Sequence, residues 1–154
     1  MELGDILASD GIVPKLTATS KKQALEELAA LAGAATGIDA REVFNALIHR
    51  ERLGSTGLGR GIAIPHVKFA SLKNILCIFA RLETPIDFES PDGDPVDLLF
   101  LLLAPEHASG DHLKALARIS RLVREPVVLE QLRNAPDKAA IKTLLTAPAP
   151  PQAA

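Results

Sequence analysis

Two long apolar runs most strongly constrain how this chain can fold. The runs ILCIFARL and VDLLFLLLA, at residues 75–82 and 96–104, are nearly all apolar and do not alternate with polar residues. Strands that are buried on both faces have this composition, and they need helices to cover both sides of their sheet. Pro105 ends the second run, and the segment between the runs, ETPIDFESPDGD, is rich in turn residues. The runs therefore predict two fully buried strands joined by a turn-rich link.

Helical patterns precede these runs. Ser20 and Asp39 stand where N-cap residues are expected, and Gln23 and Glu42 follow them by three residues, which is the spacing of a capping box. The glycines that begin at Gly54 end the second helix. Apolar residues recur at helical spacing, and the predicted stripes are Ala24, Leu25, Leu28, Leu31 and Ala32 in the first helix and Val43, Leu47 and Ile48 in the second.

The last third of the sequence is helical in pattern as well. Ser109 is a candidate cap for a helix that ends near residue 124, Pro126 starts a helix to about residue 133, and Asp137 caps one through residue 145. At the other end of the chain, residues 3–7 predict a short helical turn and residues 12–14 a short edge strand. The core-facing residues predicted for the helix after Ser109 are Leu113, Leu116, Ala117, Ile119 and Val123.

The order of helices, then strands, then helices predicts a single-domain α/β fold. In it, a mixed β-sheet is flanked by helices on both faces. A chain of 154 residues fits one domain. We expect residues 1–146 to form this domain. The uncharged, Pro- and Ala-rich segment 147–154 predicts a disordered tail.

Composition and charge exclude several classes of function. A net charge of −2 without a basic stripe gives no support for nucleic-acid binding. The single cysteine, Cys77, excludes a disulfide framework and fits a reduced, cytoplasmic location. The N-terminus MELGDILASDG lacks the basic start and apolar core of a signal peptide. No apolar run approaches the ~20 residues of a membrane helix, so no membrane insertion is expected.

The stretch GSTGLGRGIAIPHVK, residues 54–68, joins four glycines to a short apolar strand and a Pro-His pair. Glycine reaches backbone conformations that other residues avoid, and it lets a ligand approach the backbone closely. Pro65 restrains the backbone directly before His66, which is expected at a strand end. The spacing is neither a phosphate-binding P-loop nor a dinucleotide fingerprint. On this stretch alone, a turn with a surface histidine and a histidine presented to a ligand both remain open.

Together with Arg50, Glu51 and Arg52, the segment from Leu53 to His66 resembles the phosphohistidine signature of the enzyme IIA proteins of the bacterial phosphotransferase system. It resembles their mannitol/fructose-type class, and most closely the nitrogen-regulatory branch. The similarity covers nearly the whole chain up to the tail, so it identifies residues 1–146 as an enzyme IIA type-2 domain. It also implies a mixed sheet flanked by helices.

The resemblance implies a role for each of three residues. His66 matches the phosphorylated histidine, Arg50 the arginine near the phosphate, and His112, in GDHLKAL, the second active-site histidine. Val67 departs from the family, which usually has glycine after the phosphorylated histidine. Because valine is bulkier and stiffer, it is expected to restrict the approach of a donor protein.

The chemistry of a phosphohistidine suits these residues. Histidine, with an ordinary pKa of about 6.5, holds one neutral ring nitrogen as a nucleophile at neutral pH. Arg50 can grip phosphoryl oxygens with its guanidinium fork, and His112 lies near a helix start, where an anion is favoured. The loop of Ser55, Gly57, Gly59 and Gly61 is expected to turn backbone N–H groups toward the phosphoryl oxygens. No metal or cofactor is expected, because the donor is already a phosphohistidine.

Other interpretations of single residues stay open. Arg50 and His112 could each be solvent-facing helix residues, and Arg52 is a local rival of Arg50. The triplet His107, Asp111 and His112 is a weak candidate for a metal site, because its histidines do not share one helical face. His49 and His107 are expected to be surface residues, and Cys77 a small core residue. The cluster Arg118, Arg121 and Arg124 is expected to be a solvated helix face that could meet an acidic partner.

Two functions follow from the resemblance. In the first, a phosphorylated histidine phosphocarrier protein phosphorylates His66, and the phosphate regulates contacts with targets such as transporters or sensor kinases. In the second, the chain is a sugar-specific enzyme IIA that passes the phosphoryl group to an enzyme IIB of the fructose/mannitol type. The sequence shows no fused sugar-specific or membrane domain, which favours the regulatory function.

Overall fold

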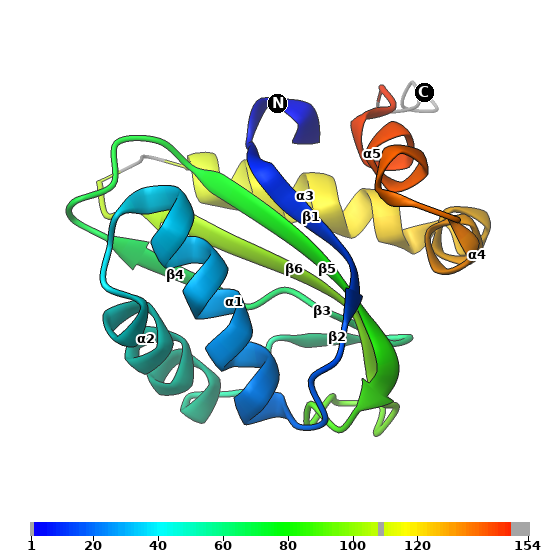
Figure 1. Ribbon diagram of the computed structural model, residues 1–154, viewed down its shortest axis with the longest axis horizontal. Coiled ribbons are helices and arrows are strands. Elements are labelled where there is room, and N and C mark those ends of the chain that lie inside the picture. Colours follow the sequence, from blue (N-terminus) through cyan, green and yellow to red (C-terminus); the bar gives the residue numbers. More distant parts are fainter. Residues whose placement is uncertain (1, 108–109, 149–154) are drawn as a thin grey trace.

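The computed structural model describes residues 2–107 and 110–148, and it arranges them as one sheet between two layers of helices (Figure 1). In chain order the elements are the 3₁₀ helix η1 (Leu3–Asp5), β1 (Leu7–Leu16), α1 (Lys21–Thr36), α2 (Ala40–Arg52), β2 (Gly57–Gly59), β3 (Ile62–Ala63), β4 (His66–Phe69), β5 (Leu76–Ile86), β6 (Val96–Pro105), α3 (Asp111–Arg124), α4 (Pro126–Asn134) and α5 (Lys138–Thr146).

The sheet is mixed, as the sequence predicts. Its strand order is β1-β5-β6-β3-β2, and β4 also pairs with β6. The two apolar runs form β5 and β6, which pair antiparallel, whereas β1 is parallel to β5 and both β3 and β4 are parallel to β6. The short strands β3 and β4 pair with successive stretches of β6, near Leu98 and Leu102 respectively. Strand β6 therefore runs through the middle of the sheet.

Alternate residues of β6 face two separate halves of the core. Leu99, Leu101 and Leu103 pack on the side of α1 and α2. Leu98, Phe100 and Leu102 pack with apolar residues of α3, α4 and α5. Both faces of the strand are thus buried, which explains why its sequence shows no alternation of polar and apolar residues. The predicted sheet with helices on both faces is confirmed.

Several local details differ from the sequence prediction. Ser20 accepts a hydrogen bond from the Gln23 backbone N–H at 3.1 Å, but the Gln23 side chain accepts from the backbone of Thr19, at 2.8 Å, so the expected reciprocal bond to Ser20 is replaced. Strand β5 continues to Ile86, so the turn-rich link begins later than predicted. Strand β1 spans ten residues instead of three. The proposed cap Ser109 lies outside the described residues, and α3 has Gly110 at its N-cap position.

The core-facing side of α3 was predicted correctly at Leu116, Ile119 and Val123 and incorrectly at Leu113 and Ala117. Leu113 is 61% exposed and Ala117 is exposed, whereas Ala115 and Arg118 are buried beside Ile119 and Val123. The guanidinium of Arg118 donates to the Ala147 carbonyl at 3.1 Å and meets the Glu2 carboxylate at 3.3 Å. These contacts draw Arg118 inward and tie both ends of the described chain to α3, so this arginine does not belong to a solvated face.

Helix α5 ends at Thr146, and a domain boundary after residue 146 stays a prediction. Most of the segment predicted to be disordered, residues 149–154, lies outside the described residues. Within residues 2–107 and 110–148, no helix combines the length and the apolar composition that crossing a membrane requires.

Candidate functional site

His66 is the first residue of β4, where that strand meets β6. The Pro65 carbonyl accepts a hydrogen bond from the Leu102 backbone at 2.9 Å, and His66 pairs with Leu102 in the sheet. The imidazole Nδ1 lies 2.7 Å from the Ile64 carbonyl oxygen. Because a carbonyl oxygen only accepts, Nδ1 carries the proton and the lone pair lies on Nε2. The backbone thus selects the ring nitrogen that can act as a nucleophile, in a partly exposed side chain.

His112 lies beside His66, as the sequence predicts. It is the second residue of α3, and both histidines line a small cavity of about 10 Å³ with Leu102, Ala104 and Leu116. Burial lowers the pKa of His112, and the nearby Lys68 and His66 lower it further. Its Nδ1 is buried and has no hydrogen-bond partner among the described residues. The site therefore holds a neutral imidazole with an unpaired ring nitrogen next to His66.

Lys68 is a member of this cluster that the sequence analysis missed. It follows His66 by two residues in β4, so the two side chains share one face of the strand. It lines the same small cavity, and its charge acts on His112. The signal was the alternation His-Val-Lys-Phe, but it becomes visible only once residues 66–69 are recognised as a strand. The structure thus adds a cation, Lys68, beside His66 and His112.

Arg50 lies at the neighbouring turn. Its Nη1 donates to the Gly54 carbonyl at 2.9 Å. Two residues further on, the Thr56 carbonyl accepts from the backbone N–H of Ile64 at 3.0 Å, and Ile64 is the residue whose carbonyl bonds His66. Arg50 is thus connected to the His66 segment through one backbone turn, and no hydrogen bond between described residues joins the two side chains. Its rival Arg52 is exposed.

The residues of the predicted phosphate loop make their contacts within the fold. Ser55 donates to the Phe88 carbonyl at 2.7 Å and accepts from the Gly57 backbone at 3.1 Å. A Cβ on Gly57 would overlap Ser90, and a Cβ on Gly59 would lie 2.9 Å from the Asp92 carboxylate. Gly61 has a φ of +83°, and a Cβ there would overlap the Arg133 guanidinium. These glycines allow close packing against the β5–β6 connection and α4.

Gly61 and His66 meet strand β6 at different points along its length. The Gly61 carbonyl accepts from Asp97 and Leu98 at 3.0 and 3.1 Å, whereas His66 pairs with Leu102. Five residues of strand correspond to roughly 16 Å. The structure therefore brings His66, His112 and Lys68 together and places Gly61 away from them. Ser55 and Gly57 flank Thr56, whose carbonyl bonds the Ile64 backbone two residues before His66.

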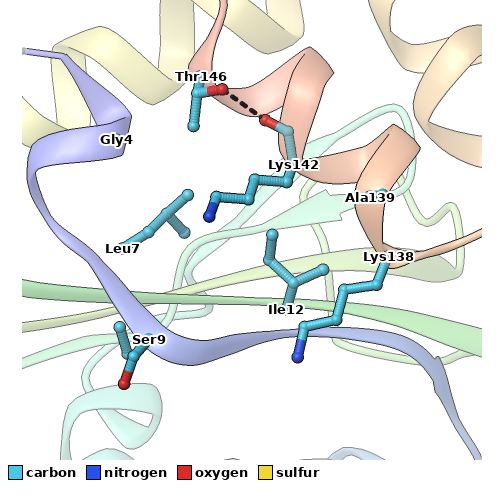
Figure 2. Close-up of a pocket in the computed structure, with 9 residues that line it drawn as sticks. Gly4, Leu7, Ser9, Ile12, Lys138, Ala139, Lys142 and Thr146 are labelled. Carbon is cyan, nitrogen blue, oxygen red and sulfur yellow. Dashed lines mark hydrogen bonds between the residues drawn. The ribbon is translucent and has the colours of Figure 1, made fainter.

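The remaining candidates lie apart from the two histidines. Burial raises the pKa of the Cys77 thiol to about 12, which fits an unreactive core residue. No group of three or more histidine, cysteine or acidic residues is arranged to hold a metal ion within the part of the chain that the structure describes. His107 and Asp111 line a separate surface pocket. Figure 2 shows another pocket, of about 420 Å³, in which Lys138 and Lys142 of α5 lie across from β1.

The fold and the site together define a class of protein. The cavity between His66 and His112 is too small for a sugar or a cofactor, while the His66 ring is partly exposed and fixed in one tautomer. Such a site suits an α/β protein that presents a nucleophilic histidine to another macromolecule. The model of the family described as "Phosphoenolpyruvate-dependent sugar phosphotransferase system, EIIA 2" matches residues 5–147, so the chain belongs to this family of phosphotransfer components.

Within this family, the chain is similar to nitrogen-regulatory proteins. It is 54% identical to the "Nitrogen regulatory protein" of Bradyrhizobium diazoefficiens over 96% of this chain and 97% of the relative. The crystal structure of Nitrogen Regulatory Protein IIA-Ntr from Neisseria meningitidis superposes with a TM-score of 0.89 at 38% identity, covering 93% of this chain and 98% of that one. The "PTS system fructose-specific EIIABC component" of Bacillus subtilis is 34% identical over 92% of this chain but only 22% of its own length.

Proposed function

We propose that this chain is a phosphohistidine carrier that accepts a phosphoryl group on Nε2 of His66 from a phosphorylated histidine phosphocarrier protein in the cytoplasm. The observation that carries the proposal is the 2.7 Å contact between Nδ1 and the Ile64 carbonyl, which leaves the Nε2 lone pair available. In the transfer, this lone pair forms a new N–P bond while the N–P bond of the donor histidine breaks. The bonding electrons return to the donor nitrogen.

The neighbouring side chains suit the charge of a phosphoryl group, which is spread over three oxygens during transfer. His112, which lines the same cavity as His66, is the neighbouring imidazole that would donate a hydrogen bond to one of these oxygens. Lys68 supplies a positive charge on the same face of β4. Arg50, held at the turn by Gly54, is the guanidinium that would reach the transferred group from α2.

The surroundings of the site suit a protein donor. Leu53 is 75% exposed and Leu113 is 61% exposed, and they follow Arg50 and His112 closely in the chain. Exposed apolar side chains around a polar site are typical of protein–protein contacts. The 10 Å³ cavity leaves no room for a bound sugar. We therefore propose that the phosphoryl group arrives on a docking protein, and that residues 1–146 suffice as the carrier domain.

A regulatory output is the proposed physiological role. The high identity to the nitrogen regulatory protein of Bradyrhizobium diazoefficiens, over nearly the full length of both chains, supports it. A phosphoryl group on His66 would add close to two negative charges beside Lys68 and so change the surface that a target contacts. The alternative is a sugar-specific enzyme IIA that passes the phosphoryl group to an enzyme IIB, and the identity to a fructose-specific component supports it.

Phosphorylation by a purified phosphorylated phosphocarrier tests the proposal. The wild type should acquire an acid-labile, base-stable phosphate, and His66→Ala should acquire none. Substitution of the exposed His49 by alanine is the matched control and should leave the labelling intact. A label that persists in His66→Ala would assign the phosphate to another residue. Adding an enzyme IIB of the fructose type then distinguishes the two outputs, because only a sugar-specific component should lose its label rapidly.

A further inference from the structure

A buried carboxylate beside the site has no part in the proposed chemistry. Glu51, next to Arg50 near the end of α2, is 8% exposed, and its side chain is 4% exposed. The C-terminal end of a helix carries partial negative charge, which disfavours an anion there. Burial adds a further cost to an ionised carboxylate unless it is paired and hydrogen-bonded. A carboxylate in this position therefore needs strong local compensation.

Three donors supply that compensation. The Lys21 ammonium lies 3.0 Å from Oε1, the Thr56 backbone N–H donates to Oε1 at 3.0 Å, and the Thr56 hydroxyl donates to Oε2 at 2.5 Å. Lys21 is itself only 15% exposed in its side chain and lies 4.6 Å from the centre of the Phe88 ring. The Lys21–Glu51 pair is thus largely shielded from water. Lys21 also lies 3.4 Å from the exposed Glu89 carboxylate, so Glu51 is its buried partner and not its only one.

These contacts hold the turn that connects Arg50 to His66. The Glu51 backbone carbonyl accepts from the Gly54 N–H at 3.1 Å, and its side chain holds both the backbone and the hydroxyl of Thr56. The Gly54 carbonyl accepts from the Arg50 guanidinium. The Thr56 carbonyl accepts from the Ile64 N–H, and the Ile64 carbonyl orients the His66 ring. Glu51 therefore fixes both ends of residues 54–56 from inside the protein, while Arg50 binds the same turn through Gly54.

We infer that Glu51 is a positioning residue for phosphoryl transfer and acts through Arg50, an inference that rests on the proposed function. Without the carboxylate, Thr56 loses two hydrogen bonds and Lys21 loses its buried partner. The turn at residues 54–56 then relaxes, and the Gly54 carbonyl no longer holds the Arg50 guanidinium in one orientation. Transfer depends on such positioning, so the loss appears in the rate.

A double-mutant cycle between Glu51→Gln and Arg50→Ala tests this inference. The glutamine keeps the size of the side chain and removes its charge. In the wild-type background, Glu51→Gln should lower kcat/KM for phosphorylation by the donor protein about 10-fold, mainly through kcat. In the Arg50→Ala background, the same substitution should cost less than about 2-fold, because the guanidinium through which it acts is absent.

Other results would overturn the inference. Equal losses in the two backgrounds would show that Glu51 supports only the fold, and an unchanged rate for Arg50→Ala would remove the residue through which it is said to act. Glu42→Gln is the matched control, since Glu42 lies exposed on the same helix and should change the rate less than about 2-fold. Thermal unfolding of each variant checks that the assays contain folded protein.

A second variant keeps the test decisive if Glu51→Gln does not fold. Thr56→Val preserves the shape and the backbone N–H but removes the hydroxyl that Glu51 accepts from. It should lower kcat/KM about 3-fold in the wild type and have no further effect with Arg50→Ala. Equal losses would again overturn the inference. A wild type that acquires no phosphohistidine would overturn the proposed function as well, so the two failures are distinguishable.

Discussion

The two ends of strand β6 differ in how completely their polar groups are paired. Near Asp97, the Arg133 guanidinium bonds the Asp97 carboxylate at 2.8 and 2.9 Å and the Arg60 carbonyl at 2.7 Å. Near Leu102, the His66 ring has one backbone contact, and the buried Nδ1 of His112 has no partner among the described residues. At the end near Asp97, which we call the paired end, the polar groups bond one another. At the end near Leu102, which we call the open end, a buried ring nitrogen has no partner among the described residues.

This difference assigns stability to one part of residues 54–68 and the proposed phosphorylation to another. Residues 54–68 pass through both ends, with Gly61 at the paired end and His66 at the open end. The Arg133 contacts are only partly exposed, with 34% of the Arg133 and 20% of the Asp97 side chain accessible, and they hold the local backbone. A buried polar group without a partner is costly, and such groups are kept where they serve a ligand. We therefore expect substitutions at the paired end to change stability, and those at the open end to change the rate of phosphorylation.

The largest effect should come from Gly61→Ala. Its φ of +83° disfavours any side chain, and the added methyl would overlap the Arg133 guanidinium and lie 2.9 Å from the Asp97 carboxylate. We expect a loss of about 3 kcal/mol of stability, from backbone strain together with displacement of the ion pair. Chemical denaturation of the variant measures this loss. The phosphorylation rate of the folded fraction should remain within about 2-fold of the wild type.

Gly93→Ala is the matched control for the contact at Gly61. Gly93 has a similar φ of +77°, but no atom lies within 4 Å of the position that its Cβ would occupy. Its loss should therefore be limited to backbone strain of about 1 kcal/mol. If Gly61→Ala slows phosphorylation more than it destabilises the fold, the two ends of β6 are coupled and the proposed separation is wrong.

The next effect belongs to the open end. His112→Ala removes the neutral imidazole beside His66, and the phosphorylation rate should fall by about 10- to 1,000-fold if the imidazole donates to a phosphoryl oxygen. Stability should change by less than about 1 kcal/mol, because a buried nitrogen without a partner contributes little to the fold. A rapid-quench assay at several donor concentrations gives the rate. His107→Ala, an exposed histidine, should behave like the wild type.

Much of the fold is predictable from the sequence because its signals are local. The apolar runs at residues 75–82 and 96–104 identified β5 and β6, and the N-cap positions of Ser20, Asp39 and Asp137 were correct. The burial of Arg118 on α3 was not predictable in this way. Arg118 is buried because distant segments, at Glu2 and Ala147, meet its guanidinium, and such contacts leave no mark in the local spacing.

The same limit applies to the candidate site. The signature pointed to His66, and His112 does lie beside it, but a glycine-rich loop next to a histidine in sequence does not have to lie next to it in space. The chain between Gly61 and His66 runs along β6, so Gly61 lies beside Asp97 and Arg133 instead of beside His66. Lys68 was missed because four residues that pair only with β6 give too short a pattern to recognise as a strand.

The smallest effect should come from Val67, and here the structure changes the expectation. The sequence suggested that this valine restricts the donor protein. In β4, however, Val67 points to the face opposite His66 and Lys68 and packs against the half of the core formed with α1 and α2. Val67→Gly should therefore cost about 1 kcal/mol of stability, through lost apolar contact and greater freedom of the unfolded backbone. Val67 also lines the small cavity beside His66. The phosphorylation rate should still stay within about 2-fold of the wild type, because the valine side chain packs into the core on the α1 and α2 side. Val67→Ala should give an intermediate stability with the same rate. A rate that rises several-fold in Val67→Gly would show that the donor protein contacts this side of β4. The surface that meets the donor would then extend beyond His66 and His112.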